Sequence, residues 1–212
     1  MKEDDKEFLI APAVAVRLSG TGGQGLLLAG RVLAQAAAIH DGLNVVLTNS
    51  YGPEARGGAS LSQVIIANGD LDELECEQVD VLVCLSQEAC DVYFDKLRQD
   101  GLLIVDSTNV GIVPTNRVVE IPITRLAREK CQNIMTANII SLGVLCGCSH
   151  IVTLKSLKSA LRAIMRPDMV ELNEKALQIG YDTVAAFIKG IPENTRAMLT
   201  RDFSYVREWK PE

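Results

Sequence analysis

The sequence predicts a doubly wound α/β fold, in which helices cover both faces of a mostly parallel sheet. Short continuous apolar stretches, typical of buried strands, alternate with longer stretches typical of helices as far as Asp106. Of the 212 residues, 48% are hydrophobic and 23% charged, a composition that suits an ordinary globular core. The length favours one α/β domain over residues 1–192, with its core at 13–190, followed by a C-terminal tail at 193–212.

The first half of the chain supplies the sheet. A strand, a glycine cluster and a helix come first, and short apolar runs then alternate with a second helix. The expected strands cover 13–18, 44–50, 59–67, 80–85 and 101–106, and the expected helices cover 26–40 and 87–99.

The second half is predicted to be helical. After RVVEIP we expect helices over 134–148, 153–165 and 168–189. Thr153 is a candidate N-cap of the second, and Pro167 stands just before the third.

Charge and hydropathy exclude several classes of protein. The net charge is −6, and residues 1–110 carry 7 basic and 17 acidic side chains, against 14 and 10 in the rest. An acidic surface without a Lys/Arg cluster speaks against nucleic-acid binding. The acidic start is unlike a signal peptide, and no apolar run is long enough to span a bilayer, so we expect a cytoplasmic protein.

The six cysteines show no C-x-x-C pair and none of the usual cluster spacings, so we expect reduced, mostly buried thiols and no metal site. Cys146, Cys148 and His150 are close enough in sequence to be weighed as metal ligands. The segment LGVLCGCSH is more typical of the packed end of an apolar helix.

The glycine cluster GTGGQG stands between the first strand and the first helix. Gly20, Gly22 and Gly25 satisfy G-x-G-x-x-G at the place where glycines let a phosphate approach the helix N-terminus. A tight packing turn without a ligand is the alternative interpretation.

Two nucleotide sites can be tested against neighbouring residues. Leu26 and Leu27 stand where a P-loop needs Lys and Ser/Thr, which excludes a P-loop NTPase. An NAD site needs an acid at the end of the second strand, and that strand ends in TNS at 48–50. The glycines therefore favour an anionic ligand other than NAD.

The loop SYGPEARGG follows the second strand, at the sheet edge where open α/β folds bind ligands. Arg56 is the only Lys or Arg between Arg31 and Lys96, and a guanidinium among glycines suits an anion or a carboxylate. A stiff turn in which Arg56 pairs with Glu54 or another acid is the alternative.

These segments together resemble the gamma subunit, or gamma domain, of the 2-oxoacid:ferredoxin oxidoreductases. The resemblance covers about residues 13–190, and its specific part is GTGGQG followed by GPEARGG. DVLVCLSQEACDVYF, NIISLGVLCG and ELNEKALQIG also match, and the style of GPEARGG and LSQEA is most like the 2-oxoglutarate members.

The resemblance implies a Rossmann-like subunit of an enzyme that oxidatively decarboxylates a 2-oxoacid to an acyl-CoA. Thiamine diphosphate and iron–sulfur clusters would lie on partner alpha and beta subunits, with a delta subunit left open, and electrons would pass to ferredoxin. Coenzyme A would be the co-substrate, with no cofactor bound tightly to this chain. The isolated chain is then expected to be inactive.

The family's ligand-facing residues transfer onto both loops. The resemblance implies a coenzyme-facing loop at Gly20, Thr21, Gly22, Gly23, Gln24 and Gly25. It implies that Glu54, Arg56, Gly57 and Gly58 form a loop facing the active site or a partner. No residue of this chain is assigned a catalytic role. A stand-alone NAD(P)-dependent dehydrogenase and a nucleotide-binding regulatory module remain the alternatives.

The tail 193–212 carries three aromatic residues, Phe203, Tyr205 and Trp209, in a segment too short to build a core of its own. We expect it to pack across a subunit interface and the isolated chain to form a homodimer. A tail folded back on its own domain is the alternative.

Overall fold

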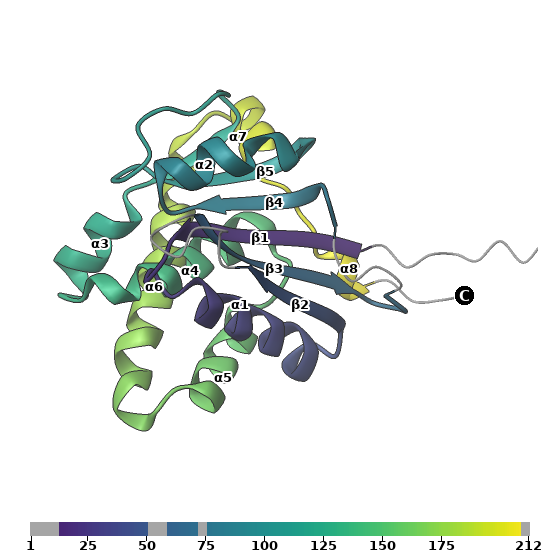
Figure 1. Cartoon of the computed structure of the whole chain (residues 1–212), viewed down its shortest axis with the longest axis vertical. Coiled ribbons are helices and arrows are strands. Elements are labelled where there is room, and N and C mark those ends of the chain that lie inside the picture. Colours follow the sequence, from purple (N-terminus) through teal and green to yellow (C-terminus); the bar gives the residue numbers. More distant parts are fainter. Residues whose placement is uncertain (1–12, 51–58, 72–75, 209–212) are drawn as a thin grey trace, which may run out of the picture.

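The computed structural model describes residues 13–50, 59–71 and 76–208 (Figure 1). They form a six-stranded sheet with the order β2-β3-β1-β4-β5-β6. The strands are β1 (Ala13–Thr21), β2 (Asn44–Ser50), β3 (Ala59–Ala67), β4 (Val79–Cys84), β5 (Leu97–Asp106) and β6 (Val118–Ile121). The predicted α/β class is confirmed, with a sheet that is mixed at one side.

Strand direction follows from the length of the connections. β1, β4, β5 and β6 are parallel neighbours, whereas β3 is antiparallel to both β1 and β2. Only the short segment 51–58 joins β2 to β3, and a parallel crossover needs a dozen residues or more. Each β4 residue is buried, which explains why this strand is a continuous apolar run.

The helices are α1 (Leu26–Gln35), α2 (Gln87–Tyr93), α3 (Ile123–Lys130), α4 (Ala137–Ser149), α5 (Leu154–Ile164), α6 (Pro167–Gly190), α7 (Glu193–Leu199) and α8 (Tyr205–Glu208). The helix predicted over 26–40 divides into α1 and a π-helical turn, Ala36–His40. Short 3₁₀ turns cover Phe94–Lys96 and Ile134–Thr136. The predicted cap is confirmed, because Thr153 accepts a hydrogen bond from the Ser156 N–H. None of these helices is long and apolar enough to cross a bilayer.

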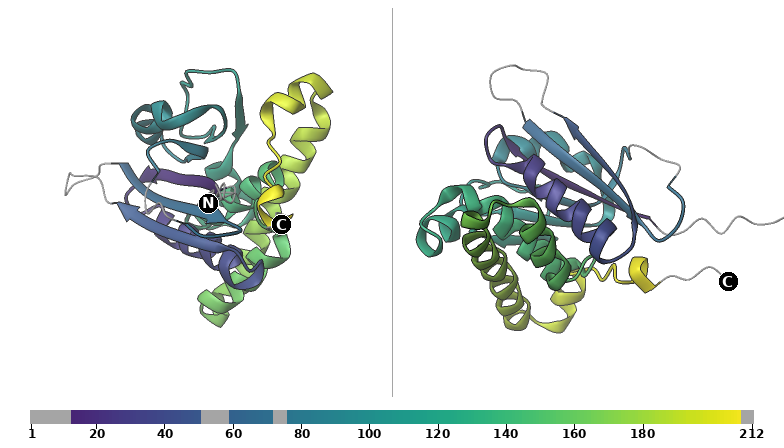
Figure 2. Two further views of the ribbon diagram at one scale, coloured as in Figure 1. Left: turned by 90° about the vertical axis from the view of Figure 1, so that its right-hand side faces the viewer. Right: turned by 90° about the horizontal axis from the view of Figure 1, so that it is seen from below.

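The two faces of the sheet are covered unequally. Val14, Val16 and Leu18 of β1 point into the larger core, which packs against α1 and the helices of the second half. Ala15 points to the other face, where Cys90 of α2 belongs to a smaller core. Figure 2 shows α4 to α6, coloured green, on the side of the sheet opposite α2.

Helices α4 and α6 cross at glycines. A Cβ atom on Gly143 would lie 2.1 Å from the Leu177 carbonyl oxygen, and one on Gly180 would lie 2.1 Å from the Ile140 carbonyl oxygen. At such distances a Cβ atom would overlap the backbone of the neighbouring helix, which would have to move. The LGVLCGC segment is therefore buried by close backbone packing, with almost every α4 residue inaccessible to water.

The C-terminal segment corrects one expectation. Phe203 is fully buried in the larger core of its own chain, and its N–H donates to the Ser149 carbonyl at 2.8 Å. This ring therefore does not pack across a subunit interface. Tyr205 is 42% exposed, its ring centroid lies 6.1 Å from that of Phe203, and Trp209 lies outside the described residues.

Replacing Gly180 with alanine should destabilise the chain, because the new methyl group would overlap the α4 backbone. We expect the free energy of unfolding to fall by about 1–3 kcal/mol or more, measured by urea denaturation. Gly190→Ala, in open space at the end of α6, is the matched control and should be neutral or stabilise by up to about 1 kcal/mol. Equal midpoints for the two variants would contradict the close crossing.

Candidate functional site

A pocket of about 560 Å³ opens at the carboxyl edge of the parallel strands. There β1 and β4 lie side by side, and their helices α1 and α2 leave to opposite faces of the sheet. Such a divergence is where doubly wound folds bind ligands. The pocket is lined by Thr21, Gly22, Gly23, Gln24, Leu85, Ser86, Asn109, Thr124, Arg128, Ile134, Met135 and Ala137.

The glycine turn joins β1 to α1 within this pocket. Gly23 and Gly25 have φ angles of 87° and 75°, in the left-handed region that favours glycine. The first helical hydrogen bond runs from Ala29 N–H to the Gly25 carbonyl, so the N–H groups of residues 26–28 have no acceptor within the helix. The turn thus presents the positive end of α1 at the pocket.

The Gln24 side chain stabilises the turn through two hydrogen bonds. Its Oε1 accepts a hydrogen bond from the Thr21 N–H at 2.8 Å, and its Nε2 donates to the Leu85 carbonyl at 3.2 Å. A Cβ atom on Gly20 would come within 2.2 Å of Gln24 Oε1. Gly20 therefore leaves room for the Gln24 side chain and does not itself line the pocket.

The other two motif glycines, Gly22 and Gly25, differ in how much space surrounds them. A Cβ atom on Gly25 would lie 2.4 Å from Asn138 Nδ2, which donates to the Gly25 carbonyl at 2.8 Å. Among the described residues, a Cβ atom on Gly22 would meet only Ser60 Oγ, at 3.9 Å. Gly22 is therefore the motif glycine beside which the described part of the chain leaves room for a ligand.

The opposite wall is built from polar residues that sequence reasoning missed. Asp106, fully buried at the end of β5, accepts hydrogen bonds from Thr124 Oγ1 and from Asn109 Nδ2. Asn109 also donates to the Leu85 carbonyl at 3.2 Å. The available signal was the sequence DSTN directly after a buried parallel strand, since the carboxyl ends of such strands meet at one sheet edge.

The electrostatics of the pocket suit an anion. Ser86 caps α2, so a second helix begins at the same wall. Arg128 of α3 is exposed and lines the pocket, and none of the described residues that line it is acidic. Helix N-termini together with a guanidinium favour phosphate or carboxylate groups.

The second predicted loop, with Glu54, Arg56, Gly57 and Gly58, lies outside the described residues. Its flanking residues are described: β2 ends at Ser50, and β3 begins at Ala59, which pairs with Thr21. The loop therefore leaves and re-enters the sheet at the edge that carries the glycine turn.

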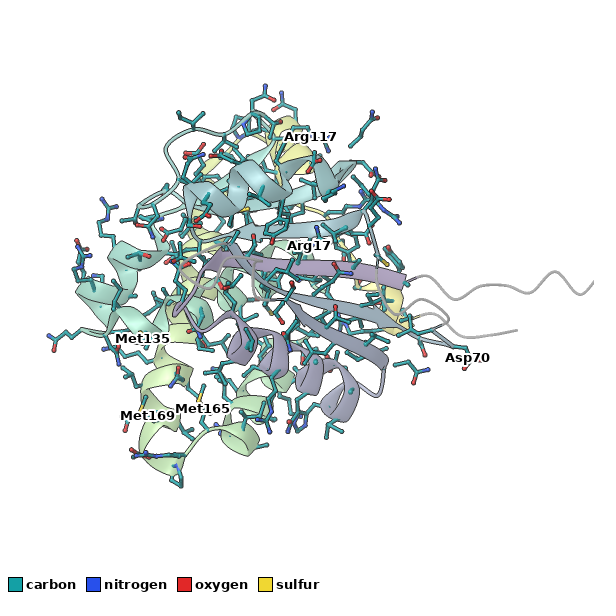
Figure 3. The ribbon with its side chains drawn as sticks, in the orientation of Figure 1. Arg17, Asp70, Arg117, Met135, Met165 and Met169 are labelled. Atoms are coloured by element: carbon teal, nitrogen blue, oxygen red, sulfur yellow. The ribbon has the colours of Figure 1, made fainter. Side chains whose placement is uncertain are left out.

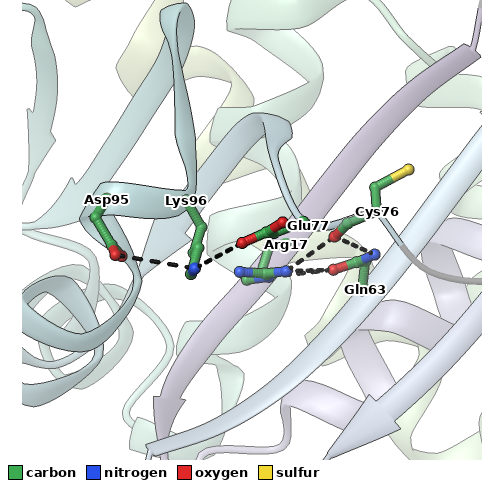
Figure 4. A network of polar contacts seen from close by, with 6 residues as sticks. All are labelled: Arg17, Gln63, Cys76, Glu77, Asp95 and Lys96. Carbon is green, nitrogen blue, oxygen red and sulfur yellow. Dashed lines mark hydrogen bonds and ion pairs between the residues drawn. The ribbon is translucent and has the colours of Figure 1, made fainter.

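A second pocket, of about 490 Å³, lies on the α2 face of the sheet. Arg17 is buried there, with its guanidinium 2.6 Å from Gln63 Oε1 and 5.4 Å from the centre of the Tyr93 ring. Lys96 pairs with Glu77 at 3.1 Å (Figure 4). The two cations of this second pocket, Arg17 and Lys96, already interact with protein groups, so the first pocket is the better anion site.

The cysteines are free, and five of the six are buried. Burial raises the pKa of both Cys146 and Cys148 to about 12, which keeps them as thiols rather than the thiolates that bind metals. Cys146 Sγ lies 3.3 Å from the Val152 carbonyl oxygen, to which it donates. Within the described ranges, no three His, Cys, Asp or Glu side chains are placed to hold a metal ion.

Comparison with known proteins supports the resemblance. Residues 15–183 match the family model described as pyruvate ferredoxin/flavodoxin oxidoreductase. The 2-oxoglutarate synthase subunit KorC of Methanocaldococcus jannaschii is 41% identical over 174 residues, which cover 79% of this chain and 91% of the relative. The ketoisovalerate oxidoreductase subunit VorA of Methanothermobacter thermautotrophicus is 31% identical, with 88% of this chain covering 39% of that longer relative.

Solved structures agree on the fold. The gamma subunit of a keto/oxoacid ferredoxin oxidoreductase from Geobacter sulfurreducens has a TM-score of 0.77 and 39% identity, over 83% of this chain and 98% of that one. A 2-oxoglutarate:ferredoxin oxidoreductase chain from Magnetococcus marinus has a TM-score of 0.73 at 22% identity, over 82% of this chain and 31% of that one. The chain therefore belongs to the pyruvate ferredoxin/flavodoxin oxidoreductase family, as a gamma-type subunit.

Proposed function

We propose that this chain is the gamma subunit of a 2-oxoglutarate:ferredoxin oxidoreductase and that it binds coenzyme A at the glycine turn. The 2-oxoglutarate synthase subunit that is 41% identical supports the substrate. The observation that carries the ligand is the space that the described residues leave open at Gly22, beside the α1 N-terminus, in a pocket where none of the described lining residues is acidic. Coenzyme A is an anion whose phosphates suit such a site.

The reaction releases CO₂ from the 2-oxoacid, joins the acyl carbon to the coenzyme thiol, and passes two electrons to ferredoxin. Thiamine diphosphate and iron–sulfur clusters on the partner subunits would supply the carbon and electron chemistry. The gamma chain would hold the coenzyme phosphates through N–H groups of the glycine turn and through Arg128, which faces the same pocket. Fixing the coenzyme in this way raises the effective concentration of its thiol at the active site.

The proposal also includes the second loop, because the strand ends that flank it are described. β2 ends at Ser50, which lines the second pocket, and β3 begins at Ala59, which pairs with Thr21 of the first pocket. Glu54, Arg56, Gly57 and Gly58, between these two strand ends in the sequence, are proposed to face the active site or a partner subunit. Arg56 would meet a carboxylate or phosphate there.

An NAD(P)-dependent dehydrogenase is disfavoured by the end of β2. The position that needs a ribose-binding carboxylate has Thr48, Asn49 and Ser50. Asn49 Oδ1 instead accepts a hydrogen bond from Ser62 Oγ at 2.7 Å. NADH titration of the pure chain separates this alternative from the proposal.

Replacing Gly22 with valine should raise the KM for coenzyme A in the assembled complex, because the branched side chain would fill the space that the phosphate needs. Losing one or two hydrogen bonds to a charged group, at about 1.5–3 kcal/mol each, corresponds to roughly tenfold or more. Steady-state kinetics at saturating 2-oxoacid measure it.

Gly190→Val is the control for Gly22→Val, since position 190 is open and far along the chain from the pocket. Its KM for coenzyme A should match that of the wild type. A folded Gly22→Val complex with an unchanged KM would refute the coenzyme site.

The isolated chain should show no absorption between about 350 and 500 nm when purified without oxygen, because its cysteines lack a cluster spacing. It should also show no oxidoreductase activity. A visible chromophore that survives purification would contradict the division of cofactors among subunits.

Arg56→Ala should lower the turnover of the assembled complex while leaving the Tm of the subunit within about 1 °C of the wild type. A loop guanidinium that binds a ligand contributes to activity rather than to the core. The opposite result, a lower Tm with full turnover, would show that Arg56 only stabilises a turn.

A further inference from the structure

Three large apolar side chains are exposed at the sheet edge that holds the pocket. Ile112 is 75% exposed, Ile134 50% and Met135 56%, and we refer to these three as the rim triad. Ile134 and Met135 line the pocket mouth, and Ile112 follows the lining residue Asn109 on the loop after β5. Figure 3 shows Met135 on the outer side of the molecule, near α3 and α6. Single exposed apolar residues are common, but a group around one pocket marks a contact surface.

The backbone that carries the rim triad is held in place. The Gln87 side chain accepts hydrogen bonds from the N–H groups of Gly111 and Ile112, both at 3.0 Å, and donates to the Ile112 carbonyl at 2.9 Å. Asn133 Oδ1 accepts from the Met135 N–H at 3.0 Å. A surface ordered in this way loses little conformational entropy when a partner docks.

Positive charge accompanies the rim triad. Arg125 and Arg128 of α3 are both exposed, and no carboxylate in the described part of the chain lies within ion-pair distance of either guanidinium. A partner that covers this face therefore needs apolar side chains flanked by acidic ones. A second copy of the chain fits poorly, because a two-fold interface would bring the same arginines together.

Two relatives point to a protein partner. The VorA relative and the Magnetococcus marinus structure carry the region similar to this chain as 39% and 31% of longer polypeptides. In those proteins the gamma-like part is joined covalently to further segments.

We propose that the rim triad, with Arg125 and Arg128, docks another chain of the same enzyme through an apolar patch flanked by acidic side chains. This inference rests on the proposed function. The docked chain covers the pocket mouth, so that a ligand held at the glycine turn is enclosed between two subunits. Ile112 contributes to docking without touching the ligand, because it does not line the pocket.

The test uses the full-length tagged chain, co-expressed with its enzyme's other chains. Ile112→Glu should lower the amount of thiamine- and cluster-carrying chains that co-purify by roughly tenfold or more, quantified by mass spectrometry. Ile39→Glu is the matched control, because Ile39 is 70% exposed on the π-helical turn, and it should retain the wild-type amount. Ile134→Glu provides a second rim variant.

The charge contribution has its own pair of variants. Arg125→Glu should weaken assembly, and its difference from the wild type should shrink at high salt, whereas Arg31→Glu on the exposed side of α1 should have no effect. Each isolated variant should keep the wild-type Tm. Isolated Ile112→Glu should also bind coenzyme A, followed by calorimetry, as the wild type does.

The outcomes separate this inference from the proposed function. If the wild type co-purifies with its partners and the rim variants do so equally well, the docking surface is wrong and the function stands. If the wild type brings down no such chain, both fail. A change in the mass of the isolated chain by light scattering on Ile112→Glu would identify a second copy as the occupant and overturn the proposal.

Discussion

The carbonyl oxygen of Leu85 joins the three loops on which the pocket depends. It accepts hydrogen bonds from Gln24, after β1, and from Asn109, after β5, each at 3.2 Å. The N–H of Leu85 in turn donates to the Ser19 carbonyl at 2.9 Å. Because Leu85 is fully buried directly after β4, these bonds fix the ends of three parallel strands relative to one another. The glycine turn can then present its N–H groups in one geometry.

The parts of the fold that the sequence predicted are those governed by local patterns. The apolar runs of β2 and β3 and the cap at Thr153 were found because period, length and capping residue act over a few neighbours. The direction of β3 was not predicted from its own residues, which fit either orientation. The short connection at 51–58, together with the strand pairing, determines the direction of β3.

Long-range contacts account for what local patterns could not give. The motif glycines look alike in sequence, yet Gly20 makes room for Gln24 and Gly25 for Asn138, whereas at Gly22 the nearest described atom would be Ser60 Oγ, at ordinary contact distance. Asn138 is more than one hundred residues away from the turn it supports. The fully buried Phe203 shows the same limit, since three aromatics in a short tail suit a subunit interface and an intrachain core equally well.

A buried carboxylate, Asp106, lies beside the proposed anion site, and its hydrogen bonds explain how the two can be neighbours. Asp106 accepts hydrogen bonds from Asn109 and Thr124, which line the pocket, and a carboxylate in the cavity itself would repel a phosphate. The Asp106 carboxylate accepts hydrogen bonds from the Thr124 hydroxyl, the Asn109 amide and the backbone N–H groups of Thr108 and Thr124. These donors stabilise the buried carboxylate, which does not line the pocket. The same acid therefore orders the Asn109 and Thr124 wall of the pocket, while the nearby α1 N-terminus and Arg128 contribute positive charge.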